Sequence, residues 1–386
     1  MISNIQKAKF ATQLNYKMKK FLSIATLILL SKAGLAQQTN MNLIIGTYTN
    51  SCDSKGIYVY DFNTETADFK LKSSTEKVIN PSFLTVSEDN KFVYSVNENG
   101  KESTVSSFAF DSKKGTLKAL NKQKSEGEDP CYILNDTKNV ISANYSGGNI
   151  SVFKKNTNGS LTPAKQIVQH KGKSRNQQRQ ESAHVHMVQF TPDKKYVLAN
   201  DLGTDKIYIY KYNPDSETNI LEIKDSIGVK RGSGPRHLTF SPNGKFAYLL
   251  QELDGTITVF SYINEELLKI EEAQIIEDDF KGEIGGADIH ISPDGKYLYA
   301  TNRGSVNDIT IFEIMKNGKL NYKTNLKTLG EGPRNFTIDP AGNFLLVAHQ
   351  NSDYVVIFKI DKLTGKLTDT GKRIALCSPV CLVFTP

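Results

Sequence analysis

The sequence predicts an all-β fold, a seven-bladed β-propeller closed by joining the N- and C-terminal strands in one blade. Three observations predict it. A pattern of short strands recurs along the chain, its last copy is incomplete, and the chain ahead of the first copy lacks the strand with which every other copy starts. Long helical periodicity is absent beyond the N-terminal segment.

The clearest copy of the repeat spans residues 235–262, PRHLTFSPNGKFAYLLQELDGTITVFSY, and reads as three short strands. Its first two strands meet at SPNGK, where Pro sets φ and Asn-Gly accommodates positive φ, as a tight reversal requires. Copies start 46 to 53 residues apart, at Pro81, Pro130, Ala183, Pro235, Ala287, Pro333 and Pro379. A period of about fifty residues with several strands per unit is typical of a β-propeller.

The two ends of the chain are complementary. The copy that starts at Pro379 supplies one strand and stops, whereas the segments NLIIGTY, GIYVYDF and FKLKSST, which precede Pro81, lack a first strand. An unclosed ring would expose strand edges, which promote aggregation. We therefore expect the ends to complete the seventh blade, and residues 37–386 to form a single propeller domain.

Residues 1–36 have the pattern of a secretory signal peptide. A basic segment that begins at Met18 precedes a short apolar run and the sequence SKAGLA, which predicts cleavage after Ala36. The apolar run is too short to span a bilayer comfortably. We expect export to the periplasm or the medium, no stable membrane insertion after cleavage, and Met18 as an alternative start of translation.

The net charge of +7 does not indicate a nucleic-acid partner, because residues 1–36 hold six Lys and no acidic residue. The remaining chain is nearly neutral, and we expect a monomer. One local basic segment, residues 171–180 (KGKSRNQQRQ), has two interpretations: a solvated insertion, or a loop that guides an anionic ligand.

Four cysteines occur in this chain, which we expect to be exported, and an oxidising compartment permits disulfides. Cys52 belongs to the first part of the closing blade, and Cys377 and Cys381 belong to its last part. A disulfide that clasps the ring is one interpretation. Buried free thiols, Cys131 among them, are the other, and the spacing is not that of a zinc site.

The repeat also predicts where chemistry occurs. The first two strands of each copy are antiparallel, so the start of one lies beside the end of the other, and both sets converge on one mouth of the central channel. The turns, with Asp193, Asn243 and Asp294 as turn formers, lie on the opposite face. Polar and charged residues gather in these two sets: Ser82, Cys131, His184, His186, Arg236, His237, His290, Arg334 and Asn335 at strand starts, and Asn97, Glu98, Asn144, Tyr145, Asp201, Glu252, Asn302, Arg303, His349 and Gln350 at strand ends.

Each candidate also has a structural interpretation. His184 and His186 alternate on a strand and could form a zinc pair, but one His in the mouth and one in structural hydrogen bonding is the alternative. Arg236 in GPRH and Arg334 in GPRN share a context that suggests a backbone role, and Glu252 could simply pair with an Arg. The substrate-binding candidates are His184, His290, Asn302, Asn144 and Asp201. The sequence contains no P-loop, GxSxG or HExxH motif that would indicate a different chemistry.

At these motifs the chain resembles the seven-bladed lactonase family, which includes 6-phosphogluconolactonases and is related to carboxymuconate lactonizing enzymes. The segments HVHMVQF, GPRHLTF, LLQE and TNRG, in that order, carry the resemblance. It places the family's site on His186, Arg236, Glu252 and Arg303, with no cofactor and no metal. A signal peptide departs from cytosolic sugar-phosphate metabolism, which puts a phosphorylated substrate in doubt.

The expected function is therefore hydrolysis of a small sugar-derived lactone. Water attacks the ester carbonyl with His186 or Glu252 as general base, Arg236 or Arg303 stabilises the oxyanion, and the other Arg holds a substrate carboxylate or phosphate. Two alternatives remain: an exported propeller that binds a carbohydrate or protein ligand without turnover, and a muconate-type cycloisomerase.

Overall fold

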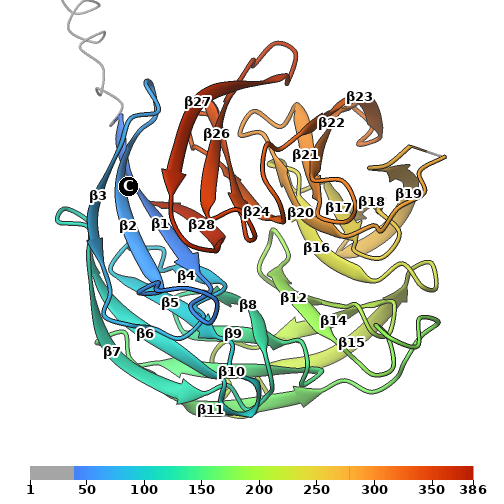
Figure 1. The fold of residues 1–386 in the computed structure, drawn as a ribbon. Helices are drawn as coiled ribbons and strands as arrows, with labels where there is room; N and C mark the ends of the chain where they lie inside the picture. The colour runs from blue at the N-terminus through green and yellow to red at the C-terminus, as the bar shows by residue number, and fades with distance from the viewer. Residues whose placement is uncertain (1–38, 278, 386) are drawn as a thin grey trace, which may run out of the picture. The chain divides into compact units, whose positions relative to one another are not determined.

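The computed structural model describes residues 39–277 and 279–385, which form a ring of seven four-stranded antiparallel sheets (Figure 1). The expected signal peptide, residues 1–36, lies outside the described residues. No helix among the described residues is long and apolar enough to cross a membrane.

The strands are arranged from the channel outward in sequence order within six of the sheets. Their bounds are β4 (Leu84–Val86), β5 (Phe92–Asn97), β6 (Thr104–Asp111) and β7 (Thr116–Lys124); β8 (Pro130–Asn135), β9 (Asn139–Asn144), β10 (Asn149–Lys155) and β11 (Leu161–Gln169); β12 (Val185–Phe190), β13 (Tyr196–Asp201), β14 (Lys206–Tyr212) and β15 (Leu221–Gly228); β16 (Pro235–Phe240), β17 (Phe246–Gln251), β18 (Thr256–Ile263) and β19 (Glu266–Gln274); β20 (Gly286–Ile291), β21 (Tyr297–Asn302), β22 (Asp308–Ile314) and β23 (Leu320–Lys327); β24 (Pro333–Ile338), β25 (Phe344–His349), β26 (Tyr354–Ile360) and β27 (Leu367–Ala375). A short 3₁₀ helix, η1 (Gly100–Glu102), lies between β5 and β6.

The seventh sheet joins both ends of the described chain and confirms the predicted closure. Its order is β28 (Pro379–Thr385), β1 (Asn40–Thr47), β2 (Ile57–Asn63) and β3 (Phe69–Ser74). The innermost strand, β28, pairs with β1 in the register Ile44↔Val383 and Ile45↔Leu382. The ring therefore has no open edge between its first and last blades.

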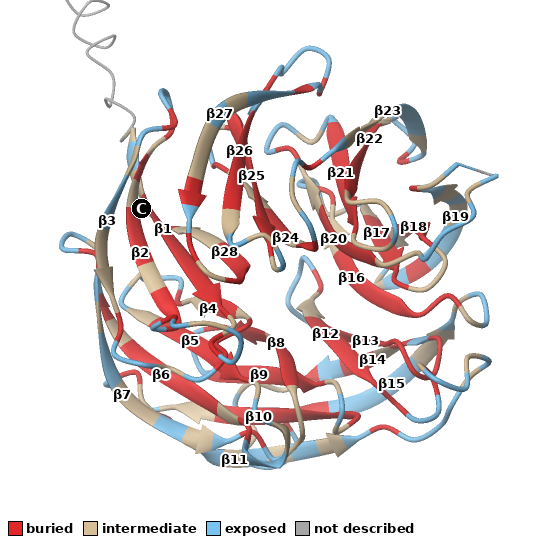
Figure 2. Ribbon diagram, in the orientation of Figure 1, coloured by how far each residue is buried: buried red, intermediate tan, exposed pale blue. Residues whose placement is uncertain are grey.

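The strands of each blade differ in how far they are buried (Figure 2). Strands in the middle of a blade, such as β9, β21 and β25, are buried at every position because neighbouring blades cover both faces. The outermost strands are more exposed, and in β11 buried or half-buried residues alternate with exposed ones because one face meets solvent. Between blades, Met187, Leu198, Leu249 and Phe260 belong to one buried cluster.

The turns that join the first two strands of a blade behave as predicted. Asn243 Oδ1 accepts hydrogen bonds from Ser241 Oγ at 2.7 Å and from the Lys245 amide at 3.0 Å, and Gly244 follows with φ of +69°. Asp193 and Asp294 accept equivalent bonds in their own turns. These turns lie at the end of the blades opposite the strand starts.

A register shift at the start of the inner strand recurs in most blades and decides which side chains reach the channel. It occurs between Pro130 and Tyr132, Val185 and Met187, Pro235 and His237, Gly286 and Ile289, and Pro333 and Asn335. Residues left without a partner on the neighbouring strand include Cys131, His186, Arg236 and Arg334. Bulges commonly redirect a side chain in this way.

Side chains at or just after these shifts tether some blades to the next one. In four junctions a side chain accepts a backbone N–H from the following blade: Met187 Sδ from Leu238 at 3.0 Å, Asp288 Oδ2 from Phe336 at 3.1 Å, Asn335 Oδ1 from Leu382 at 2.7 Å, and Cys381 Sγ from Leu84 at 3.3 Å. These bonds satisfy buried amides that no strand pairs. They hold the strand starts, and so the site, in a fixed ring.

A disulfide between Cys52 and Cys377 adds a covalent link to the closing blade. It joins the β1–β2 connection to the β27–β28 connection. Cys131 and Cys381 are buried free thiols. The clasping disulfide therefore uses Cys377 and not Cys381, which instead contributes its sulfur to the tether with Leu84.

Candidate active site

A cavity of about 530 Å³ opens at the mouth formed by the strand starts and strand ends. All seven blades contribute to its lining. The lining residues are Tyr48, Glu98, Asp129, Cys131, Tyr145, Ser146, Arg179, His186, Glu252, Glu283, Ile284, Gly285, Arg303, Gly304 and Arg334. Of the four residues expected to be catalytic, His186, Glu252 and Arg303 line it.

Glu252, which follows β17, is the centre of the charged groups. Its Oε2 accepts a hydrogen bond from Arg236 Nε at 2.9 Å and lies 3.3 Å from Arg303 Nη2, and its Oε1 accepts one from Arg179 Nη2 at 2.6 Å. Burial opposes ionisation of this carboxyl, but the three guanidinium charges outweigh burial and lower its pKa to about 2. The three guanidinium groups therefore favour the ionised form of Glu252 at neutral pH.

Arg236 supports Glu252 from beneath the cavity and does not line it. Its side chain is almost wholly buried, and its Nη1 donates to the carbonyl oxygen of Ala287 in the next blade. With both contacts made, the guanidinium holds the carboxylate in place. Of the two arginines expected to contact substrate, Arg303 is the one placed at the cavity surface.

His186 lies beside Glu252 and is kept neutral by its surroundings. Its Nε2 is 3.8 Å from Glu252 Oε2, and its Nδ1 has no hydrogen-bond partner. Burial and the neighbouring charges of Arg236 and Arg334 hold the pKa of His186 well below its usual value. A neutral imidazole keeps one unprotonated nitrogen, which can accept a proton.

Arg179 comes from the basic segment 171–180 and was not among the sequence candidates. Besides Glu252, its Nη2 contacts the Tyr145 hydroxyl at 3.1 Å. The adjacent Gln180 is fully buried and anchors the segment by donating to the Leu202 carbonyl at 2.8 Å and to Asp205 Oδ1 at 2.7 Å. The only sequence signal was the position of this basic segment, immediately before the strand that carries His186.

A second polar group lies across the ring from Glu252. Glu98, which follows β5, accepts hydrogen bonds from Ser82 Oγ and, at 3.2 Å, from the Tyr48 hydroxyl. The Arg334 guanidinium lies 5.7 Å from the centre of the Tyr48 ring. Burial outweighs the favourable charge of Arg334 and raises the pKa of Glu98. Sequence reasoning placed Glu98 and Arg334 at the rim without selecting them.

Four of the five expected substrate-binding residues support the cavity from outside. Asn302 Oδ1 accepts from the Gly285 and Gly304 amides at 2.9 and 3.3 Å, which shapes the wall beside Arg303. His184 stacks on Tyr145, with ring centres 4.6 Å apart.

Asp201 accepts from the His184 amide at 2.9 Å and pairs with His170 at 2.8 Å. Asn144 bonds to Asn149 Oδ1 at 2.8 Å and to Ser151 Oγ at 3.0 Å. None of these four lines the cavity.

His290 lies farther from the start of its strand than the repeat alignment suggested, and its side chain is partly exposed. Strand β20 begins at Gly286, opposite Asn302, so the rim position of this blade is Ala287 and not His290. His290 Nε2 instead bonds to Asp288 Oδ2 at 3.0 Å, and its ring meets Phe336. Its expected contact with substrate at the cavity is therefore not supported.

The two histidines considered as a zinc pair have separate partners. His184 Nε2 bonds to Glu181 at 3.0 Å, whereas His186 faces Glu252. Among the described residues, no group of three or more His, Cys, Asp or Glu side chains is arranged to hold a metal ion.

Comparison with known proteins agrees with this architecture. The family model for lactonases with a seven-bladed β-propeller matches residues 42–384. The chain belongs to the lactonase family. This result confirms the resemblance found in the sequence.

Two relatives and one solved structure illustrate the match. A 6-phosphogluconolactonase of Formosa agariphila is 38% identical over 344 residues, which is 86% of this chain and 96% of the relative. A 6-phosphogluconolactonase of Bacillus subtilis is 34% identical over 345 residues, which is 88% and 97%. The periplasmic gluconolactonase of Pseudomonas aeruginosa is 33% identical, with a TM-score of 0.85 over 90% of this chain and 99% of that one. These matches confirm the expectation of an enzyme of the lactonase class.

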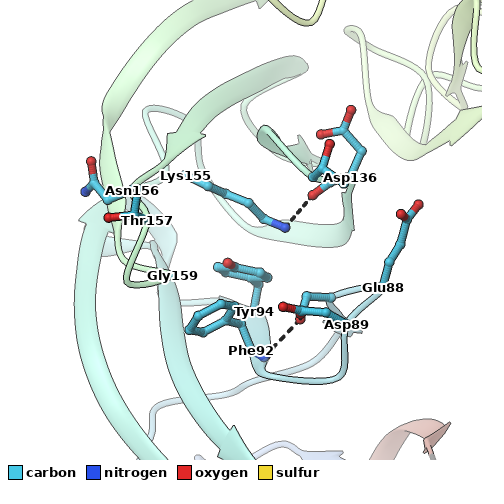
Figure 3. A pocket seen from close by; sticks show the side chains of 11 residues that line it. Glu88, Asp89, Phe92, Tyr94, Asp136, Lys155, Asn156, Thr157 and Gly159 are labelled. Carbon is cyan, nitrogen blue, oxygen red and sulfur yellow. Dashed lines mark hydrogen bonds between the residues drawn. The ribbon is translucent and has the colours of Figure 1, made fainter.

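This lactonase-family protein has another hollow, of about 540 Å³, at the turn end of the blades (Figure 3). Its charged groups serve the fold. Lys155 Nζ donates to Asn135 Oδ1 at 2.6 Å and to the Asp136 carbonyl, and Asp136 Oδ2 accepts from Tyr212 at 2.7 Å. No Arg or His is among the described residues that line it, and it lacks the grouped charges of the mouth.

Proposed function

We propose that this protein hydrolyses a sugar-derived lactone at the cavity centred on Glu252. The observation that carries the proposal is the pairing of a carboxylate bound by three guanidinium groups with a neutral histidine in one cavity. The named activities of its lactonase relatives support the same reaction class.

In the proposed mechanism His186 is the general base. Both carboxylate oxygens of Glu252 already contact guanidinium groups, so Glu252 is poorly placed to deprotonate water. The neutral imidazole takes the proton, and the carboxylate 3.8 Å away stabilises the imidazolium that forms. The water oxygen then bonds to the lactone carbonyl carbon.

Arg303 is the proposed donor to the oxyanion. It lines the cavity and is partly exposed, and its Nε has no hydrogen-bond partner. Removing a single oxyanion donor commonly costs about 3 kcal/mol of transition-state stabilisation. Arg334 and Arg179, which also line the cavity, are placed to hold anionic or hydroxyl groups of the substrate.

We further propose that the protein is exported and that residues 1–36 are removed. The basic-then-apolar pattern of these residues supports export, and a disulfide between Cys52 and Cys377 suits an oxidising compartment. One relative, the Pseudomonas aeruginosa enzyme, is described as periplasmic. A lactone without phosphate fits such a location better than a sugar phosphate.

The test is acid release, followed by pH-stat, from gluconolactone and from its 6-phosphate, corrected for spontaneous hydrolysis. We expect turnover above background, preference for the unphosphorylated lactone, and loss of turnover in Arg303→Ala while the protein remains folded. If the folded protein releases no acid from either lactone, a propeller that binds a ligand without turnover is favoured. Ring closure of an unsaturated dicarboxylate would instead indicate a cycloisomerase.

A further inference from the structure

Glu98 is a carboxyl group in the cavity that the mechanism above does not use. It extends from the end of β5, in a blade on the other side of the ring from the blade that carries Glu252. Ser82 Oγ donates to its Oε1, and the Tyr48 hydroxyl lies 3.2 Å from both of its oxygens. Ser82 and Tyr48, from two different segments of the chain, thus hold the Glu98 carboxyl group at the cavity surface.

Opening a lactone requires a proton donor as well as a base. When the bond between the carbonyl carbon and the ring oxygen breaks, that oxygen leaves as an alkoxide, which is a poor leaving group unless it is protonated. The proton that His186 takes from water is held beside the Glu252 carboxylate, on the opposite side of the ring from Glu98. A separate acid at the same cavity would complete the reaction.

We propose that Glu98 is this acid and protonates the ring oxygen as the carbon–oxygen bond breaks. The inference rests on the proposed lactonase function. Water gives one proton to His186 and its oxygen to the carbonyl carbon, and Glu98 gives its proton to the ring oxygen. His186 then releases its proton to solvent, Glu98 takes one up, and the product is the open hydroxy acid.

The surroundings of Glu98 favour the protonated form. Burial raises its pKa and Asp129 adds to that effect, while the charge of Arg334 and the hydrogen bonds from Ser82 and Tyr48 oppose it. Glu252, by contrast, has its pKa lowered to about 2. Two carboxyl groups with pKa values shifted in opposite directions across one cavity are typical of a division into acid and anion.

The other candidates for a proton donor are less suitable. Burial raises the pKa of Cys131 and of Tyr48 far above neutrality, so both hold their protons strongly. Glu98 also borders a neighbouring open hollow of about 610 Å³, lined by Asn50, Asn80 and Gln350 among others. That hollow gives solvent a route by which the carboxyl can be reprotonated after each turnover.

The experiment compares two lactones that differ in how much they need an acid. Gluconolactone releases an alkoxide, whereas dihydrocoumarin releases a phenol with a pKa of about 10, which leaves without help. The variant is Glu98→Gln in the full chain. The control is Glu102→Gln, an exposed carboxylate in the same β5–β6 connection that does not line the cavity.

For Glu98→Gln we expect kcat on gluconolactone to fall by about 100-fold or more, and kcat on dihydrocoumarin to fall by less than about fivefold. The wild-type rate on gluconolactone should decline as pH rises through the raised pKa of Glu98, and this alkaline limb should be absent from the variant. Glu102→Gln should match wild type.

Equal losses on both lactones would show that Glu98 only positions Tyr48 or Arg334, and would overturn the proposal. An unchanged rate on gluconolactone would overturn it as well. If wild type hydrolyses only the sugar lactone, the pH profile of the Glu98→Gln variant is the test. An alkaline limb that remains in the variant belongs to another group and would overturn the proposal. If wild type hydrolyses neither lactone, the proposed lactonase function is wrong, and the acid role of Glu98 is wrong with it.

Discussion

Arg236 Nε donates to Glu252 Oε2 at 2.9 Å, while the other end of the same guanidinium donates to the Ala287 carbonyl. One buried side chain therefore positions the central carboxylate and ties blade β16–β19 to blade β20–β23. The cavity and the ring share this support, so changes at Arg236 or Glu252 affect stability as well as activity.

Arg236→Met should destabilise the fold strongly. It leaves the buried Glu252 with one charge partner fewer, and breaking a buried ion pair typically costs about 3–5 kcal/mol. Urea denaturation at pH 7 measures the loss. Arg373→Met is the matched control, because Arg373 pairs with Asp369 near the surface and such pairs contribute about 0–1 kcal/mol. Similar losses in both variants would contradict a structural role specific to Arg236.

The pH dependence of stability should report Glu252. Its folded pKa of about 2 lies below its ordinary value of 4.5, so its contribution is complete above pH 4.5 and is lost as pH falls toward 2. The difference in unfolding free energy between wild type and Glu252→Gln should therefore shrink over this window. A difference that stays constant between pH 5 and pH 3 would argue against the lowered pKa.

His186→Gln should abolish most turnover and keep the melting temperature close to that of wild type. General bases commonly contribute about 100- to 10,000-fold to the rate. Because the base acts when neutral and the pKa of His186 is held well below 6.5, the wild-type kcat should show no acidic limb near pH 6.5. A limb centred there would assign the base to another group.

Arg179→Ala should weaken substrate binding more than it changes stability. The Arg179 side chain is partly exposed, and its loop is anchored separately by Gln180, so we expect the melting temperature to stay within about 2 °C. KM should rise by about tenfold if one charge-assisted contact of about 1.4 kcal/mol is lost. Arg175→Ala, an exposed change in the same loop, should leave KM unchanged.

Reduction should weaken closure of the ring. Cys52 and Cys377 are 325 residues apart, and restricting so long a loop in the unfolded chain contributes up to about 5 kcal/mol. Dithiothreitol should lower the melting temperature of wild type but not that of a Cys52→Ser, Cys377→Ser double variant. Native protein should not react with a thiol reagent, because Cys131 and Cys381 are buried.

Much of the site was predictable because repeats convert sequence positions into places on a ring. The strand-start and strand-end sets contained His186, Glu252, Arg303, Glu98 and Arg334, all of which line the cavity. We expected His290 at the rim, but counted back from the SPDG turn His290 occupies the position of Thr239, and β20 begins at Gly286 as β16 begins at Pro235. An alignment anchored at the turn puts Ala287, not His290, at the rim position that Arg236 occupies in the preceding blade.

Arg179 shows a second limit. It lies in a segment outside the repeat, so no periodic rule places it, and its composition fits a solvated loop equally well. Only the anchor formed by Gln180 with Leu202 and Asp205 directs the segment over the mouth. Contacts between residues distant in sequence decide such positions.

The sequence by itself determined the all-β class, the number of blades, the closure by both ends and the mouth at which the polar strand starts and ends gather. Each of these follows from local strand patterns and from the repeat period. Only the tertiary structure decided that Arg236 lies beneath the cavity, that Arg179 enters it, that Cys377 and not Cys381 pairs with Cys52, and that the two glutamates have opposite pKa shifts. Those properties depend on burial and on charges brought together across the ring, and no single segment of the chain carries that information.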